Sequence, residues 1–268
     1  MALASLAMYD MAPAVRSAND ALWSVVRDRL RAEGFSAPER LNHDIGHEAA
    51  WLQPDLVFAQ TCGYPFIMQL RGRVRLIGTP RYRFAGGSGS DRASFVIVRD
   101  ESVFSSVEAL RGTRAAINDR MSNSGMNLLR ALVAPLAVSG RFFSDVRVTG
   151  GHLASMAAVR EGLADVAAID SVTYGLTAVH DPSRVAGLKI LAETPAGPGL
   201  PIITRLDASD AEVAVLRAIL PEIATDPIHA AIAAPLGLIG FDLLSEPAYE
   251  RLALLAEQAW ALDYPELA

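Results

Sequence analysis

Short apolar runs alternate with amphipathic segments along the first hundred residues. The runs have the length of buried strands, and they cover residues 2–8, 55–59, 74–77 and 94–98. From Pro13 to Gly34 apolar side chains recur at helical spacing, which predicts one amphipathic helix that ends at the glycine. A short strand over 39–41 and a short helix containing His47 and Trp51 are predicted to follow.

The same alternation continues after residue 100, with polar residues at the strand ends. Strands are predicted over 115–117, 146–148, 165–169, 188–192 and 201–204. Helices are predicted from Gly125 to about residue 133, from Ser155 to Gly162, and after Asp207. The order of strands and helices favours an α/β fold with mostly parallel sheets flanked by helices.

Length and composition fit a folded protein with a sizeable core. A chain of 268 residues suits one large domain or two lobes of about 100–150 residues. With 51% hydrophobic and 20% charged residues, it has ample material for a packed core, and disorder is not expected. The net charge of −6 argues against a nucleic-acid partner, because affinity for the phosphate backbone needs a basic surface.

The single cysteine and the lengths of the apolar segments limit the class of protein further. Cys62 is the only cysteine, so an internal disulfide and a multi-cysteine metal site are excluded. The first residues lack the basic region and long apolar run of a secretory signal, so none is expected in this chain. No stretch approaches the roughly 20 apolar residues of a membrane span. We therefore expect a soluble protein, cytoplasmic if the chain is full length.

Polar clusters follow five of the predicted strands. They are Tyr9-Asp10, residues 60–64 (Gln-Thr-Cys-Gly-Tyr), residues 122–125 (Ser-Asn-Ser-Gly), residues 150–152 (Gly-Gly-His) with Ser155, and Asp170-Ser171. In open parallel sheets ligands bind beyond the carboxyl ends of the strands. These clusters are therefore the candidate ligand-binding residues.

Two of the clusters suit an oxyanion. Ser122, Asn123, Ser124 and Gly125 stand directly before a helix, where free N–H groups and the helix dipole favour negative charge. The alternative is that Ser122 or Ser124 only caps the helix.

The second cluster adds a histidine. The turn before His152 and Ser155 would present further N–H groups, and His152 would donate to an anion or, alternatively, cap its own helix. Asp170, at the end of an apolar strand, would accept a hydrogen bond from a ligand amine or a protonated oxyanion, or would cap the next segment.

Other candidates are weaker. His43 and His47 have the spacing of a helical metal pair with Glu48 beside them, but no third ligand is evident. Nothing adjacent to Cys62 supplies a base that would make it a nucleophile. The glycine-rich stretch 86–90 is a flexible surface loop and lacks the Lys-Ser/Thr of a phosphate loop. We therefore assign no catalytic residue, no metal and no cofactor.

The chain resembles the phosphate/phosphite/phosphonate-binding proteins of ABC importers. The resemblance covers nearly the whole chain and is carried by five stretches. They are Pro54–Leu56 leading to Gln60–Pro65, Val107 to Gly112, Asn123 to Asn127, Thr149–Ser155 with Gly162–Asp170, and Pro235 to Phe241.

The resemblance implies a two-lobed type II periplasmic binding-protein fold with two hinge crossovers near 94–98 and 200–204. Lobe 1 would hold residues 1–98 plus 200–268, and lobe 2 residues 99–199. The oxyanion would sit on the helix after Ser124 and against His152 and Ser155, while Tyr9, Gln60, Thr61, Gly63 and Tyr64 would contribute from the first lobe.

The leading hypothesis is a solute-binding protein that captures a small anionic or zwitterionic, phosphonate-like ligand by lobe closure, without chemistry. By the resemblance it would be periplasmic and would serve an ABC permease. The second hypothesis is a cytoplasmic enzyme that reuses the same fold, as menaquinone-pathway or thiamin-precursor proteins do, with His152 and Asp170 as an acid–base pair. A third is a ligand-sensing module that acts on another protein.

Overall fold

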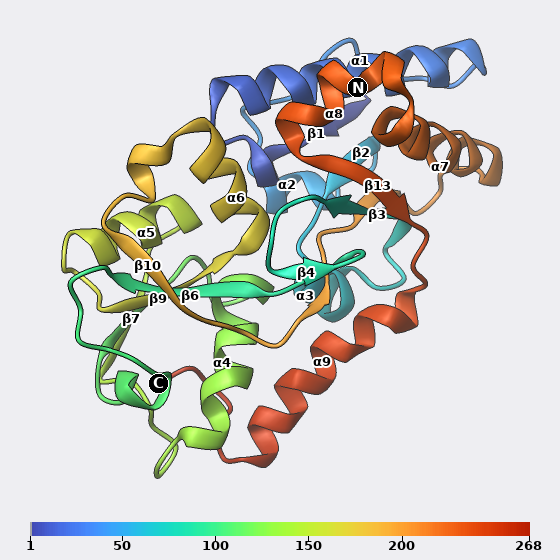
Figure 1. Ribbon diagram of the computed structural model, residues 1–268. Helices are drawn as coiled ribbons and strands as arrows, with labels where there is room; N and C mark the ends of the chain where they lie inside the picture. Colours follow the sequence, from blue (N-terminus) through green and yellow to red (C-terminus); the bar gives the residue numbers. More distant parts are fainter. Residues whose placement is uncertain (1) are drawn as a thin grey trace. The chain divides into compact units, whose positions relative to one another are not determined.

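The computed structural model describes residues 2–268, which form two compact units (Figure 1). Unit 1 comprises residues 2–83 and 198–248, and unit 2 comprises residues 84–197 and 249–268. The lobes predicted from the sequence place residues 84–98 and 249–268 in the first lobe instead. These segments belong to unit 2 because β6 (Ser94–Arg99) pairs with strands of that unit, and because Asn127 donates to the main-chain oxygen of Leu252.

Unit 1 contains a five-stranded mixed sheet. Its strands, in spatial order, are β1 (Leu3–Ser5), β2 (Leu56–Gln60), β12 (Ile202–Arg205), β3 (Val74–Tyr82) and β13 (Leu238–Asp242). Only β1 and β2 pair in parallel, and the other three pairings are antiparallel. The sheet is therefore less parallel than predicted, because β12 returns from unit 2 and inserts between β2 and β3 in the opposite direction.

The helices of unit 1 follow the apolar pattern. They are α1 (Pro13–Ala32), α2 (His47–Trp51), α3 (Gly63–Pro65), α7 (Asp210–Thr225) and α8 (Ala230–Leu236), with irregular helical turns at Ala7–Tyr9 (η1), Phe66–Leu70 (η2) and Pro227–His229 (η7). Helix α1 has Pro13 in its first turn and is followed by Gly34, whose φ is +82°. It buries Trp23 and packs against α7 and α8 (Figure 1).

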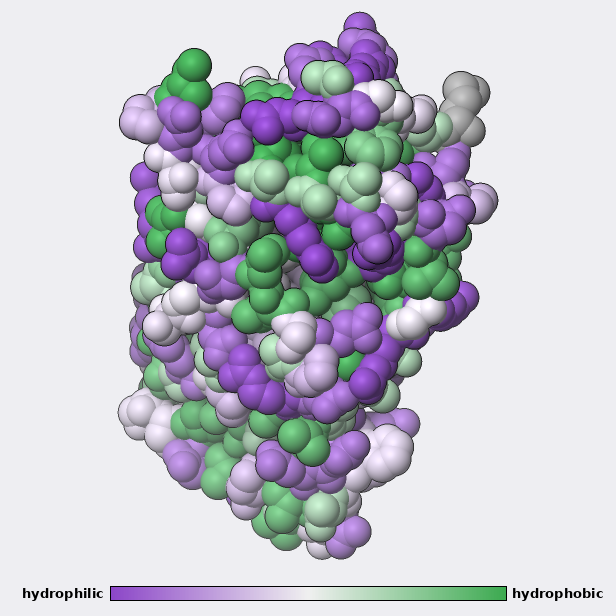
Figure 2. Space-filling model, turned by 90° about the vertical axis from the view of Figure 1, so that its right-hand side faces the viewer, coloured by the Kyte–Doolittle hydropathy of each residue, from purple (hydrophilic) through white to green (hydrophobic). Residues whose placement is uncertain are grey.

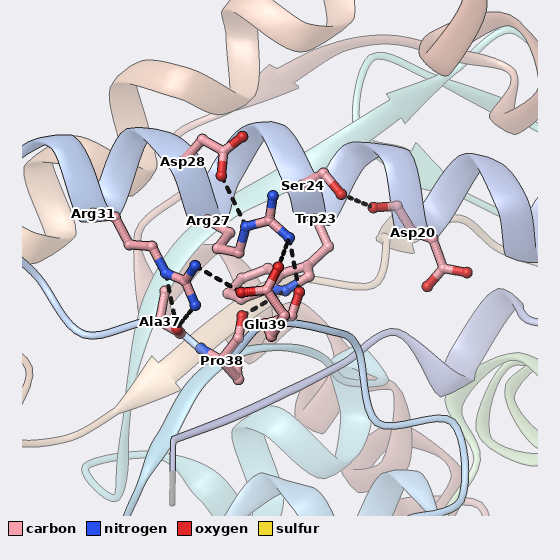
Figure 3. A network of polar contacts seen from close by, with 9 residues as sticks. All are labelled: Asp20, Trp23, Ser24, Arg27, Asp28, Arg31, Ala37, Pro38 and Glu39. Atoms are coloured by element: carbon pink, nitrogen blue, oxygen red, sulfur yellow. Dashed lines mark hydrogen bonds and ion pairs between the residues drawn. The ribbon is translucent and has the colours of Figure 1, made fainter.

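Residues 39–41, predicted as a strand, are not in a sheet. Arg27 and Arg31 of α1 both bind the carboxylate of Glu39, and the indole of Trp23 donates to the main-chain oxygen of Pro38 at 3.2 Å (Figure 3). The backbone of this segment is thus held by side chains of α1 and not by a neighbouring strand.

Unit 2 contains a second five-stranded sheet. Its order is β10 (Leu188–Glu193), β6, β9 (Val166–Asp170), β7 (Arg114–Ile117) and β8 (Asp145–Val148). The pairs β9–β7 and β7–β8 are parallel, whereas β6 runs antiparallel to both its neighbours. Phe95, Ile97, Met156 and Ile169 form part of the core against this sheet.

The helices of unit 2 lie after its strands. They are α4 (Leu128–Val133), α5 (His152–Arg160), α6 (Ser171–His180) and most of α9 (Glu246–Ala261), with shorter turns at Glu108–Leu110 (η3), Asn123–Asn127 (η4), Ala134–Leu136 (η5) and Pro182–Arg184 (η6). The stretch 86–90 is more ordered than predicted, because β4 (Gly87–Ser88) pairs with β5 (Asp91–Arg92).

Hydrophilic and hydrophobic residues are intermixed on the face drawn in Figure 2. Within residues 2–268, no helix has both the length and the apolar character that crossing a membrane requires.

An ion pair with a buried carboxylate connects β12 and α7 in unit 1. Arg205 at the end of β12 donates to both carboxylate oxygens of Glu212 in α7, at 2.9 and 2.7 Å. The side chain of Glu212 is only 4% exposed, so its charge depends on this partner. Removal of one member of a buried pair leaves an uncompensated charge.

Arg205→Met is therefore expected to lower the free energy of unfolding by about 3 kcal/mol. The matched control is Arg29→Met, which breaks the solvent-exposed pair of Arg29 with Glu222 and should cost at most about 1 kcal/mol. Urea unfolding of both variants measures the difference. Equal losses would show that Glu212 does not depend on Arg205.

Candidate functional site

The residues after β7 lead into α4 through the wide helical turn η4 (Asn123–Asn127). Ser122 caps this turn, since its Oγ accepts a hydrogen bond from the N–H of Gly125 at 3.0 Å. Asn123 is also used locally, because its Oδ1 accepts from Asn127 Nδ2 at 3.1 Å. The capping alternative therefore describes what Ser122 does in this structure.

Ser124 has a different environment. Its Oγ lies 2.9 Å from Nε2 of His152, the first residue of α5. The structure thus brings together the two serine- and histidine-bearing clusters that the sequence predicts separately. The pair offers a hydroxyl oriented by an imidazole at the start of a helix.

Gly125 permits this approach of the two turns. A Cβ atom at this position would lie 1.8 Å from Oδ1 of Asn118 and 3.3 Å from Cε1 of His152. Asn118 in turn binds the second turn, since its main-chain oxygen accepts from the N–H of Gly150 at 2.9 Å. Asn118 was not predicted as a site residue, and a lone asparagine after a strand gives no signal that would have identified it.

Burial determines the charge of His152. Desolvation, the larger effect, lowers the pKa of its imidazole, and the carboxylate of Asp170 acts in the opposite direction. The ring Nδ1 is buried and, within the described residues, has no hydrogen-bond partner. His152 therefore favours the neutral form, which keeps one ring nitrogen as a donor and the other as an acceptor.

Ser155 of α5 and Asp170 at the end of β9 are the other two predicted site residues of unit 2. Ser155 is fully buried, and its Oγ is 2.7 Å from Oγ1 of Thr149. Asp170 caps α6, since its Oδ1 accepts from the N–H of Thr173 at 2.7 Å. The capping alternative is realised for Asp170 as well, while its charge still acts on His152.

Four of the predicted residues of unit 1 lie at the end of β2 or shortly after it. Gln60 is buried, and its Nε2 donates to the main-chain oxygen of Leu200 at 3.1 Å. The main-chain oxygen of Gln60 accepts from the indole of Trp51 at 3.1 Å. Thr61 is fully buried, and its N–H donates to Pro201. Gly63 and Tyr64 form the first turn of α3 and are both buried.

Tyr82 of β3 connects Tyr9 to this strand end. The rings of Tyr9 and Tyr82 meet edge to face with centroids 5.8 Å apart, and Gln60 Nε2 is 3.4 Å from the Tyr82 hydroxyl. Tyr82 was missed, because it lies at the end of a strand predicted to stop at residue 77.

The weaker candidates for a metal site or a nucleophile have other contacts in the structure. His43 lies outside α2 and its ring nitrogens face Asp10 and Asp20, whereas His47 packs against Trp51. Across residues 2–268 there is no group of three or more His, Cys, Asp or Glu side chains suited to hold a metal ion. Cys62 is buried directly before α3.

The fold is that of the type II periplasmic binding proteins. The sequence matches the family model of ABC transporter phosphonate periplasmic substrate-binding proteins over residues 53–249. The chain therefore belongs to this family. Comparison with curated proteins gives no significant match.

Solved structures support the same fold. The chain is similar to a binding protein component of an ABC phosphonate transporter from Pseudomonas aeruginosa, with 18% identity, a TM-score of 0.74, and coverage of 91% of this chain and 82% of the other. For PhnD1 from Prochlorococcus marinus in complex with methylphosphonate, the identity is 15% and the TM-score 0.73, and the match covers 96% of this chain and 97% of the other. For the Xanthomonas citri protein XAC2383 bound to ATP, the identity is 20% and the TM-score 0.69, and the match covers 98% of this chain and 97% of the other.

These comparisons confirm the predicted family, the α/β fold class and the solute-binding role. They do not favour the hypothesis of a cytoplasmic enzyme. The contribution of each predicted residue to ligand binding stays a prediction.

The lowered pKa of His152 has a measurable consequence. Below the ordinary histidine pKa of about 6.5, the unfolded chain binds a proton that the folded protein resists, so stability falls as the pH falls. The slope for one such group is at most about 1.4 kcal/mol per pH unit.

We expect His152→Gln to reduce this loss of stability between pH 6.5 and 5, measured as the free energy of unfolding at each pH. His47→Gln replaces an exposed histidine and serves as the control, which should keep the wild-type profile. An unchanged slope in the His152 variant would show that this imidazole is not held neutral.

Proposed function

We propose that this protein binds a small ligand through a phosphonate or phosphate group held by the turn Ser122–Gly125 and by the Ser124–His152 pair. The observation that carries the proposal is the 2.9 Å contact between Ser124 Oγ and His152 Nε2, in a chain of the phosphonate-binding family. Its support from relatives is the complex of the similar PhnD1 protein with methylphosphonate.

The chemistry of the pair fits an oxyanion. When Nε2 of a neutral His152 donates to Ser124 Oγ, the serine hydroxyl is left to donate to a ligand oxygen. Hydrogen bonds from neutral donors to an anionic oxygen are stronger than those between neutral groups. Ser155 and Asp170 complete this part of the proposed site, with Asp170 accepting from a protonated ligand oxygen or an amine.

The remaining ligand contacts are proposed to come from unit 1. Tyr9, Gln60, Thr61, Gly63 and Tyr64 are all buried residues at or near the end of β2, or contact it through Tyr82. Aromatic rings and amides of this kind suit the substituent of a phosphonate more than its charged group.

The biological setting is part of the proposal. Membership of the periplasmic substrate-binding family supports a periplasmic location and delivery of the ligand to an ABC permease. The ATP complex of the similar Xanthomonas citri protein makes a nucleotide the second ligand class to test.

Isothermal titration calorimetry of the purified protein with methylphosphonate, phosphite, phosphate and ATP tests the ligand. We expect saturable binding of methylphosphonate or another of the small oxyanions. Binding of ATP alone would assign the nucleotide class instead, and heat from none of them would contradict the proposed function.

Ser124→Ala tests the proposed site within that experiment. Loss of one hydrogen bond to a charged group costs about 1.5–3 kcal/mol, which weakens binding about 10- to 150-fold. Ser183→Ala, which removes only an exposed hydroxyl bonded to Asp181, should bind as the wild type does. Equal affinity of both variants would place the anion away from Ser124.

A further inference from the structure

Three buried polar side chains, which we call the amide relay, lead from the turn η4 into α4. Asn123 Oδ1 accepts a hydrogen bond from Asn127 Nδ2 at 3.1 Å, and Asn127 Oδ1 accepts one from Arg130 Nη2 at 2.9 Å. Asn123 and Arg130 are each 5% exposed, and Asn127 is fully buried. A broken contact in such a row leaves a buried polar group unpaired, so the row is held in one arrangement.

Arg130 carries the charge of the amide relay and binds two neutral oxygens. Its Nη1 donates to the main-chain oxygen of Pro265 at 2.6 Å, and its Nη2 donates to the side-chain oxygen of Asn127. Burial of a charge costs free energy unless hydrogen bonds offset it. The bond to Asn127 is therefore one of the contacts that keep the guanidinium in place.

The neighbours of Asn127 determine how its side-chain amide is oriented. A guanidinium has only donors, so Asn127 must present its oxygen to Arg130. A main-chain oxygen only accepts, and Asn127 Nδ2 donates to that of Leu252 at 3.0 Å. Both neighbours require the same orientation, which turns the nitrogen of Asn127 toward Asn123.

The orientation of Asn123 follows from that of Asn127. Because Asn127 presents an N–H, Asn123 must present its oxygen, and its own amino group lies on the side away from Asn127. This amino group has two N–H groups, so it can donate to an oxyanion in addition to an acceptor within the protein. Asn123 directly precedes Ser124, whose hydroxyl contacts His152. The amide relay thus makes the turn present a donor at residue 123.

We propose that Arg130 and Asn127 are positioning residues that hold the amino group of Asn123 toward the bound oxyanion. The inference rests on the proposed function, in which the turn Ser122–Gly125 binds a phosphonate or phosphate group. An oxygen of Asn123 in the same place would repel the anion. An amide that is oriented before the ligand arrives also loses less freedom on binding.

The first test determines whether Asn123 donates to the ligand. Methylphosphonate binding is measured by calorimetry for the wild type and for Asn123→Ala. Loss of one hydrogen bond to a charged group is expected to weaken binding about 10- to 150-fold. An affinity equal to that of the wild type would overturn the inference and leave the proposed roles of Ser124 and His152 standing.

The second test determines whether Asn127 acts through Asn123. Asn127→Leu removes both ends of the amide at similar size, and it is expected to weaken binding about tenfold. In the Asn123→Ala background the same substitution should change the affinity less than about twofold, because the amide that it positions is absent. Equal effects in both backgrounds would show that Asn127 only supports the turn, and would overturn its positioning role.

The donors of Arg130 are tested by a pair of substitutions. Arg130→Met keeps only the apolar stem and should weaken binding about tenfold, whereas Arg130→Lys keeps a charged donor for Asn127 and should recover most of this loss. Equal affinities of these two variants would contradict the role of Arg130.

Tyr264→Phe is the control for the C-terminal segment that Arg130 also binds. It removes the hydrogen bond from the N–H of Ala268 to the Tyr264 hydroxyl, at 2.9 Å, without changing the amide relay. We expect it to lower the free energy of unfolding and to keep the wild-type affinity. A loss of affinity as large as that of Arg130→Met would assign the effect of Arg130 to the C-terminal segment and overturn its positioning role.

The wild-type protein provides a further measurement if Asn127→Leu does not fold. The side-chain 15N and 1H signals of Asn123 are followed by NMR as methylphosphonate is added, and they should move more than those of Asn42, an exposed asparagine of unit 1. Asn123 signals that stay constant at saturation would overturn the inference.

The outcomes separate the two proposals. Binding of methylphosphonate that does not depend on Asn123 overturns the inference and leaves the proposed function standing. Failure of methylphosphonate, phosphite and phosphate to bind the wild type contradicts the proposed function, and the inference falls with it.

Discussion

The candidate site in unit 2 depends on the close approach of two turns that are about thirty residues apart in the sequence. Gly125 has no side chain where a Cβ atom would meet Asn118, and Asn118 binds the backbone of Gly150. The hydrogen bond between Ser124 and His152 exists because of this approach. Any residue larger than glycine would have to displace Asn118, and with it the turn that begins α5.

Most polar side chains of the predicted clusters have structural duties as well. Ser122 and Asp170 cap helical segments, and Gln60 and Thr61 bind the main chain around residues 200 and 201. From the sequence, helix capping and ligand binding are alternative roles for the same side chain. A side chain that is fixed by a cap is, however, also preorganised for a ligand. Preorganised donors lose less freedom when an anion arrives.

The sequence predicts local structure well, and it predicts contacts between residues that are far apart in the chain poorly. The apolar period identifies α1 and β2, and glycine with serine after a strand identifies the two turns, because these signals are short-range. The proximity of Asn118 to Gly125, the role of Tyr82 and the return of residues 249–268 to unit 2 depend on tertiary packing. Strand β13 was missed because Gly240 interrupts its short apolar pattern.

The bond from the Trp51 indole to the main-chain oxygen of Gln60 places a natural fluorophore at the end of β2. Trp51 is 3% exposed and Trp23 1%, whereas Trp260 is 63% exposed, so a water-soluble quencher would silence mainly Trp260. The residual emission then comes from two enclosed indoles, only one of which is bonded to a proposed ligand-binding residue. The protein thus contains an intrinsic optical reporter of changes at Gln60.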